Sequence, residues 1–134
     1  MKNIIYLIFS VFVMSSMGCD DEYDIDGIAP QNDARIIRVS IDVRDVPFDA
    51  QRTFYNHDLQ EVIVHILPGM DWTSFAVFVS PTLWSTMTPE GGQTEDWSSG
   101  SKSYTVTSGD GSVTNTYNVI IEEVTQFGDN DPWG

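Results

Sequence analysis

The stretch Tyr104-Thr105-Val106-Thr107-Ser108-Gly109-Asp110-Gly111, followed shortly by Tyr117-Asn118-Val119-Ile120-Ile121, decides the fold. Apolar residues alternate with polar ones on both sides of Asp110-Gly111, and a period of two is typical of a strand with one buried face. Asp-Gly between two such runs supplies the positive φ that a tight hairpin turn needs. The sequence therefore predicts an antiparallel hairpin over residues 103–107 and 117–121.

The chain upstream of this hairpin carries further strand signals. Residues 37–44 alternate, and their expected buried positions are Ile37, Val39, Ile41 and Val43. A second strand is predicted near residues 59–67, with Val62, Val64 and Ile66 on one face. A third strand is predicted over residues 75–79, and a short fourth strand over residues 83–87. Residues 88–101 have the composition of a long exposed loop. Because no segment has a helical apolar period, we predict an all-β antiparallel sandwich.

The N-terminus has a different pattern. Lys2 precedes an apolar run over residues 4–14, and small residues lead from there to Cys19. This order is typical of a secretory signal peptide, and the run is too short for a permanent membrane-spanning helix. A buried or free thiol is the alternative interpretation of Cys19, but a lone reactive cysteine is unusual in a secreted chain.

Residues 15–26 resemble the export region of Bacteroidetes-type surface lipoproteins, although Ser16 replaces the usual leucine of the processing box. The resemblance implies that Cys19 carries the acyl chains and that Asp20, Asp21 and Glu22 form the export signal. The expected location is the outer membrane, lipid-anchored and facing the cell exterior. The membrane is then a partner through the acyl chains.

Composition indicates the domain boundaries and argues against nucleic acid as a partner. We expect a signal peptide at 1–18, an acidic tether at 19–33, the sandwich at 34–125 and an acidic tail at 126–134. The net charge is −14, which repels phosphate backbones and argues against nucleic-acid binding. With one cysteine, no intrachain disulfide can form, so stability must come from apolar burial.

The titratable residues do not form a recognisable catalytic or metal motif. His57 and His65 are the only histidines, and we place them in a turn and on a solvated strand face. The carboxylate pair Glu122-Glu123 would point to opposite faces of a strand, while Glu95-Asp96 lies in the loop. Residues 22–27 faintly match a calcium loop, but the tether is the favoured interpretation. We predict no catalytic residue, no metal site and no cofactor.

The four tryptophans are the main candidates for binding. Trp72 and Trp84 border turns on either side of the third predicted strand, and they either fill the core or stack on sugar rings. Trp97 is expected to pack under the 88–101 loop, and Trp133 is expected in a solvated tail.

The hairpin motif carries a second resemblance. The run Tyr104 to Thr107, then Asp110-Gly111, then Tyr117 and Val119 is similar to the closing hairpin of immunoglobulin-like domains in Bacteroidetes-type surface lipoproteins. The similarity covers roughly residues 36–124. It implies an immunoglobulin-like sandwich, a module that often precedes a domain linked to carbohydrate use.

Three functions follow from these patterns. The first is a non-catalytic accessory or adhesion module on the cell surface that binds glycan or a surface protein. The second is a structural spacer or assembly subunit that acts through an exposed sheet edge. The third is a glycoside hydrolase that uses Glu95 or Asp96.

Overall fold

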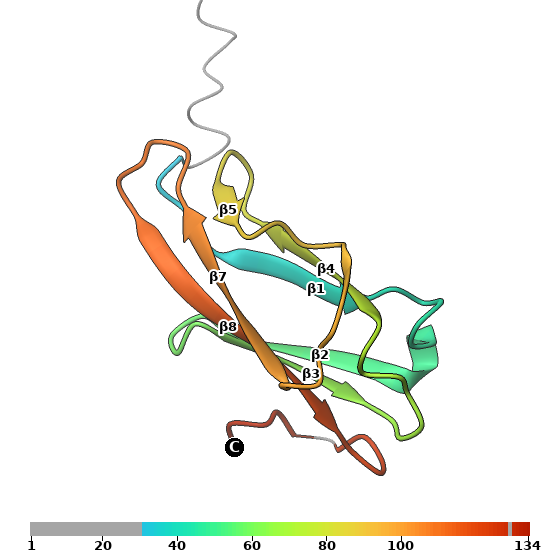
Figure 1. The fold of residues 1–134 in the computed structure, drawn as a ribbon. Helices are drawn as coiled ribbons and strands as arrows, with labels where there is room; N and C mark the ends of the chain where they lie inside the picture. Colours follow the sequence, from blue (N-terminus) through green and yellow to red (C-terminus); the bar gives the residue numbers. More distant parts are fainter. Residues whose placement is uncertain (1–30, 129) are drawn as a thin grey trace, which may run out of the picture. The chain divides into compact units, whose positions relative to one another are not determined.

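A computed structural model describes residues 31–128 and 130–134 as an all-β unit (Figure 1). Its strands are β1 (Ile36–Ile41), β2 (Gln51–Asn56), β3 (Glu61–Ile66), β4 (Phe75–Pro81), β5 (Thr86–Thr88), β6 (Thr94–Glu95), β7 (Ser101–Thr107) and β8 (Thr114–Glu123). A 3-10 turn, η2 (Phe48–Ala50), leads into β2. Within this described part, no helix is long and apolar enough to cross a membrane.

The strands form two sheets that pack face to face. The smaller sheet has the order β1-β4-β6, and the larger has the order β2-β3-β8-β7-β5. The prediction of an all-β sandwich is confirmed. One detail differs from an antiparallel immunoglobulin-like pattern, because β3 and β8 pair in parallel, with Ile63 opposite Ile120. A parallel pair needs a long crossover connection, which the intervening strands of both sheets supply here.

The predicted closing hairpin is present. β7 and β8 pair antiparallel with Tyr104 opposite Tyr117, and both rings are buried. Gly111 adopts φ of 75° in the turn between them. The second predicted strand is also confirmed, since Val62, Val64 and Ile66 of β3 lie fully in the core.

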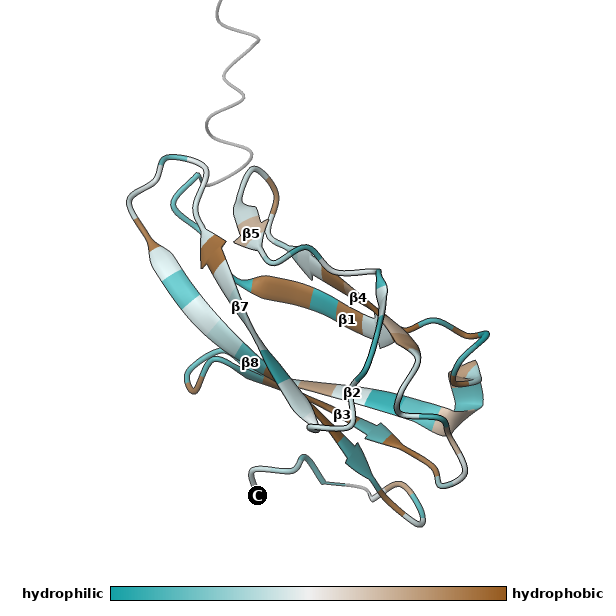
Figure 2. Ribbon diagram, viewed as in Figure 1, coloured by the Kyte–Doolittle hydropathy of each residue, from teal (hydrophilic) through white to brown (hydrophobic). Residues whose placement is uncertain are grey.

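The inward face of β1 differs from the predicted one. Ile36 is buried and Ile37 is exposed, because the register of β1 against β4 shifts between Ile36 and Arg38. An extra residue in one strand reverses which side chains point inward. Val39 and Ile41 beyond the shift are buried as expected, whereas Val43 lies past the strand end and is exposed. Figure 2 shows the change of hydropathy along β1.

The loop predicted over residues 88–101 is more ordered than its composition indicates. It contains β6, which pairs with the start of β4. Trp97 is fully buried, and its backbone N–H donates to the Trp72 carbonyl over 2.7 Å. The Lys102 Nζ lies 5.0 Å from the centre of the Trp97 ring and 2.8 Å from a Glu95 oxygen. The structural role predicted for Trp97 is therefore confirmed.

Side chains of β2 join the two sheets along one side of the sandwich. The Gln51 amide accepts from the Ile41 N–H over 2.9 Å and donates to the Ile41 carbonyl over 2.8 Å. The Thr53 hydroxyl donates to the Val39 carbonyl, and the Tyr55 hydroxyl accepts from the Val39 N–H. All four backbone groups of Val39 and Ile41 are thereby paired with β2 side chains. We call this set of hydrogen bonds the β1–β2 bridge.

Replacing Gln51 by leucine should weaken the domain. The Gln51→Leu change removes the partners of the Ile41 N–H and C=O and of the Val46 carbonyl. We expect the free energy of unfolding to fall by about 2 kcal/mol in urea denaturation, since unpaired partly buried backbone groups cost roughly that much. The same change at exposed Gln93 should alter it by less than about 0.5 kcal/mol. Equal effects at both positions would contradict a structural role for the bridge.

Candidate functional site

A surface groove of about 420 Å³ follows the β1–β2 bridge. Arg38 and Ser40 of β1 line one side, and Thr53 and Tyr55 of β2 line the other. Phe48 of η2 contributes an aromatic ring. The groove exists because a side chain stands between the two backbones, which keeps them farther apart than the roughly 4.8 Å of a hydrogen-bonded ladder. We call it the β1–β2 groove.

The groove presents two aromatic rings to solvent. Phe48 follows Pro47 at the start of η2 and is 83% exposed, so its ring is available to a ligand. Tyr55 is partly exposed and stacks on His57 with the ring centres 6.3 Å apart. Its hydroxyl oxygen accepts from the Val39 N–H over 2.9 Å, so its proton is free to donate to a ligand.

Arg38 is the cation of the groove. Among the described residues it has no carboxylate partner, whereas Arg35 and Arg44 pair with Asp33 and Asp42. The hydrogen bonds from Arg44 lower the pKa of Asp42 to about 2, so that pair is ionised at neutral pH. The described groove lining contains no aspartate or glutamate. The described lining is therefore mainly apolar and neutral polar, with Arg38 as its one charged side chain.

The structure does not bring Trp72 and Trp84 together. Trp72 precedes β4 and Trp84 follows it, so roughly 20 Å of strand separates them at about 3.3 Å per residue. Trp72 is half-buried against the core, with its ring 5.8 Å from that of Phe75. Trp84 is 56% exposed. The pair therefore forms no single sugar-binding platform.

Trp84 occupies the tip of a tight turn. The Ser85 N–H donates to the Thr82 carbonyl over 3.1 Å, which places Leu83 and Trp84 at the two central positions. Trp84 has φ of 69°, a conformation that glycine and asparagine usually adopt at this turn position. Gly109 makes room behind the turn, because a Cβ there would lie 2.9 Å from the Trp84 carbonyl oxygen. We call residues 82–85 the Trp84 turn.

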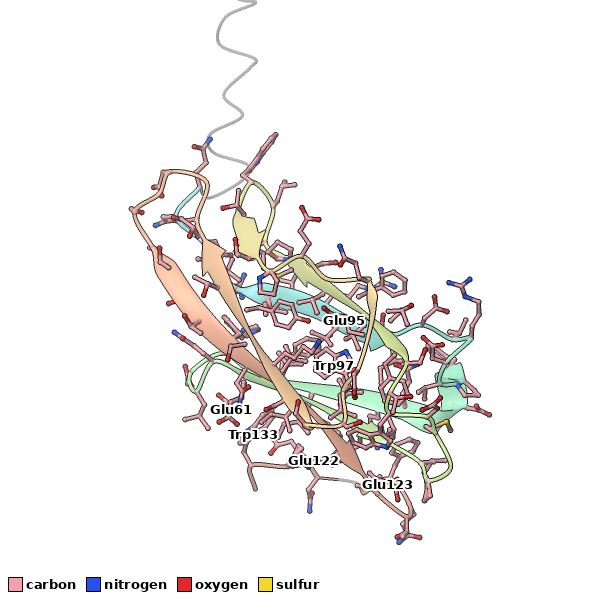
Figure 3. All side chains as sticks on the ribbon, viewed as in Figure 1. Glu61, Glu95, Trp97, Glu122, Glu123 and Trp133 are labelled. Carbon is pink, nitrogen blue, oxygen red and sulfur yellow. The ribbon has the colours of Figure 1, made fainter. Side chains whose placement is uncertain are left out.

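The candidate carboxylates are held in separate local interactions. Glu95 pairs with Lys102, and hydrogen bonding from the side chain and the backbone N–H of Ser98 lowers the pKa of Asp96. Glu122 lies 3.2 Å from the His65 Nε2, and Glu123 is its neighbour on the opposite face of β8. Figure 3 shows Glu95 well apart from Glu122 and Glu123.

The histidines and the C-terminal tryptophan also have local partners. His57 begins a turn, as predicted, and its Nδ1 lies 2.8 Å from the Tyr117 hydroxyl. Trp133 differs from the predicted solvated residue, because it is half-buried and its Nε1 donates to Glu61 over 2.9 Å (Figure 3). No cluster of three metal-ligating side chains occurs in residues 31–128 and 130–134.

Four of the predicted site residues lie outside the described part of the chain. These are Cys19, Asp20, Asp21 and Glu22. The groove was not predicted, although Gln51, Thr53 and Tyr55 carry a detectable signal. They alternate with a period of two, as side chains on one face of a strand do, but they are polar rather than apolar.

No known family model matches the chain, and no curated protein sequence matches it. Solved structures that share its fold include the following two. One is a Bacteroides thetaiotaomicron protein provisionally described as a glycoside hydrolase, with a TM-score of 0.59 and 25% identity over 72% of this chain. The other is a Bacteroides fragilis protein provisionally described as secreted, with a TM-score of 0.55 and 13% identity over 69% of this chain. The chain spans 26% of the first protein and 97% of the second.

Replacing Trp84 by glycine should stabilise the domain. The left-handed conformation costs a non-glycine residue roughly 1–2 kcal/mol, while the extra chain entropy of glycine costs about 0.5–1 kcal/mol. We expect Trp84→Gly to raise the free energy of unfolding by about 0.5–1 kcal/mol in urea denaturation. Leu83→Gly is the matched control and should lower it, because Leu83 does not have a positive φ. A loss of stability in Trp84→Gly would show that the exposed ring contributes to folding.

Proposed function

We propose that this protein is a non-catalytic, lipid-anchored module of the cell exterior that binds glycan in the β1–β2 groove. The observation that carries the proposal is a single groove lined by the exposed ring of Phe48, the ring of Tyr55 and the guanidinium of Arg38. A concave apolar surface with a few fixed polar groups is the usual form of a ligand site.

Sugar chains suit this combination of groups. The C–H face of a sugar ring packs on an aromatic ring, and Phe48 and Tyr55 offer two such rings. Ring hydroxyls need donors and acceptors at the edge, which the Tyr55 hydroxyl, Ser40 and the Arg38 guanidinium supply. The similarity to part of a protein provisionally described as a glycoside hydrolase supports a carbohydrate ligand.

The groove lining supports binding without hydrolysis. Glycoside hydrolysis ordinarily needs two carboxyl groups roughly 5–10 Å apart across the scissile bond. The described lining of the groove has none, and the carboxylates of Glu95 and Glu122 are paired with Lys102 and His65. A ligand in the groove would therefore be held rather than cleaved.

The N-terminal sequence supports the anchor. Lys2, the apolar run over residues 4–14 and Cys19 match a lipoprotein signal, and the acidic residues after Cys19 match a surface-export signal. We expect mass spectrometry of the protein from its native membrane to find a chain that starts at acylated Cys19. Cys19→Ala should leave the precursor uncleaved and remove the acyl mass. An unmodified Cys19 thiol in the native protein would refute the anchor.

Glycan binding can be tested with variants that spare the core. Phe48→Ala and Arg38→Ala change exposed residues, so both proteins should fold. We expect each to raise the Kd measured by retardation in affinity gels containing soluble polysaccharides by about fivefold or more, since the loss of one aromatic or charged contact costs about 1 kcal/mol or more.

Phe78→Ala is the matched control for this test. Phe78 is also an exposed phenylalanine, but it lies on β4 outside the groove. Its replacement should leave binding unchanged. Failure of the unaltered protein to bind across a broad glycan array would refute the glycan part of the proposal.

A further inference from the structure

The Trp84 turn lies at the end of the domain where the chain enters it. The Thr82 hydroxyl donates to the Asp33 carbonyl over 2.9 Å, and the Thr82 N–H donates to the Arg35 carbonyl over 2.9 Å. The Asp110 N–H of the β7–β8 turn donates to the Gln31 carbonyl over 3.0 Å. Figure 1 shows β5 and the β7–β8 turn at one end of the sandwich and the C-terminus toward the other. The first described residues therefore run directly beside the Trp84 turn.

The tip of this turn is apolar, and the polar groups of Thr82 and Ser85 behind it are hydrogen-bonded. Leu83 is 66% exposed and Trp84 is 56% exposed. Behind them, the Thr82 carbonyl accepts from the Ser85 N–H and from the Ser85 hydroxyl, and the Thr82 hydroxyl is also bonded. Paired polar groups lower the cost of moving a turn out of water. Tryptophan in particular prefers the boundary between water and hydrocarbon in a membrane.

The length of the tether keeps this end close to an anchor at Cys19. Eleven residues separate Cys19 from Gln31. At full extension a segment of that length reaches about 40 Å, so an anchor at Cys19 lies within that distance of Gln31. Tethering converts a weak surface contact into an intramolecular one with an effective concentration in the millimolar range. A tethered domain therefore needs less buried apolar area to contact the bilayer than a free one does.

We propose that the Leu83-Trp84 tip inserts into the interfacial layer of the bilayer that holds the anchor. This inference rests on the lipid anchor of the proposed function. A neutral zwitterionic surface suits this tip better than an anionic one, because Asp110 borders the turn and the tether carries five further acidic residues, while the charge of Asp33 is balanced by its pair with Arg35. Arg35 lowers the pKa of Asp33, and the Ser112 and Ser108 hydrogen bonds lower that of Asp110, so both carboxylates are charged at neutral pH.

The insertion also sets the direction of the groove. β1 begins at Ile36 beside the Trp84 turn and runs away from it to Ile41. Val43 and Phe48 follow beyond the far end of β1, roughly 20 Å along the strand. A domain seated on the membrane by Leu83 and Trp84 would hold the Phe48 end of the groove outward.

Quenching by brominated lipid tests the proposal. The full lipoprotein is reconstituted into phosphatidylcholine vesicles whose acyl chains carry bromine, which quenches tryptophan fluorescence on contact. We expect clear quenching in the unaltered protein and loss of at least half of it in Trp84→Ser. Trp133→Phe is the matched control and should keep the quenching, because Trp133 belongs to the C-terminal segment and bonds to Glu61. Exchange of half of the phosphatidylcholine for phosphatidylglycerol should reduce the quenching at low salt.

Each contrary result has a separate meaning. Equal quenching in the unaltered protein and in Trp84→Ser would overturn the insertion while leaving the anchor intact. If native Cys19 proves unmodified, the anchor fails, and the insertion is then tested on the same chain with its single thiol coupled to a maleimide phospholipid. Trp84 fluorescence that responds to oligosaccharides but not to brominated lipid would overturn the proposal in favour of a second glycan contact.

Discussion

The β1–β2 bridge is the interaction on which the rest of the structure depends. An edge strand normally exposes a row of unpaired backbone groups, which invites pairing with another chain. Here Gln51, Thr53 and Tyr55 satisfy that row on β1 with side chains from the opposite sheet. The sandwich is closed along this side without a backbone ladder. The same spacing that closes it leaves the groove, so stability and the candidate binding surface arise from one set of hydrogen bonds.

The sequence was informative wherever apolar residues alternate and the strand is regular. This holds for β3 and for the β7–β8 hairpin, whose inward residues were predicted individually. The prediction failed in part of β1, because a register shift reverses the pattern at Ile37. It missed β2 entirely, because the residues of β2 that face β1 are Gln51, Thr53 and Tyr55, which hydrogen-bond instead of filling the core. Since the candidate groove is built on β2, the site could not be predicted from apolar periodicity.

The tryptophans show the same limit at the level of single residues. Composition alone does not separate Trp97, which is fully buried, from Trp84, which stands on a turn. The difference comes from backbone contacts far along the chain, such as the hydrogen bond from Trp97 to the Trp72 carbonyl. Trp84 has a positive φ, which the neighbouring residues in the sequence do not predict. The positive φ at that position is maintained against the conformational preference of tryptophan, which is why a function for Trp84 is worth proposing.

The parallel pairing of β3 with β8 has a consequence for the order of assembly. Residues 61–66 find their neighbour only when residues 118–123 are available, so the larger sheet cannot be completed from a partial chain. Non-local pairing of this kind slows folding, because a long loop must close before the contact forms. A chain that emerges from the N-terminus onward therefore holds β2 and β3 without their neighbour until its last strand is available.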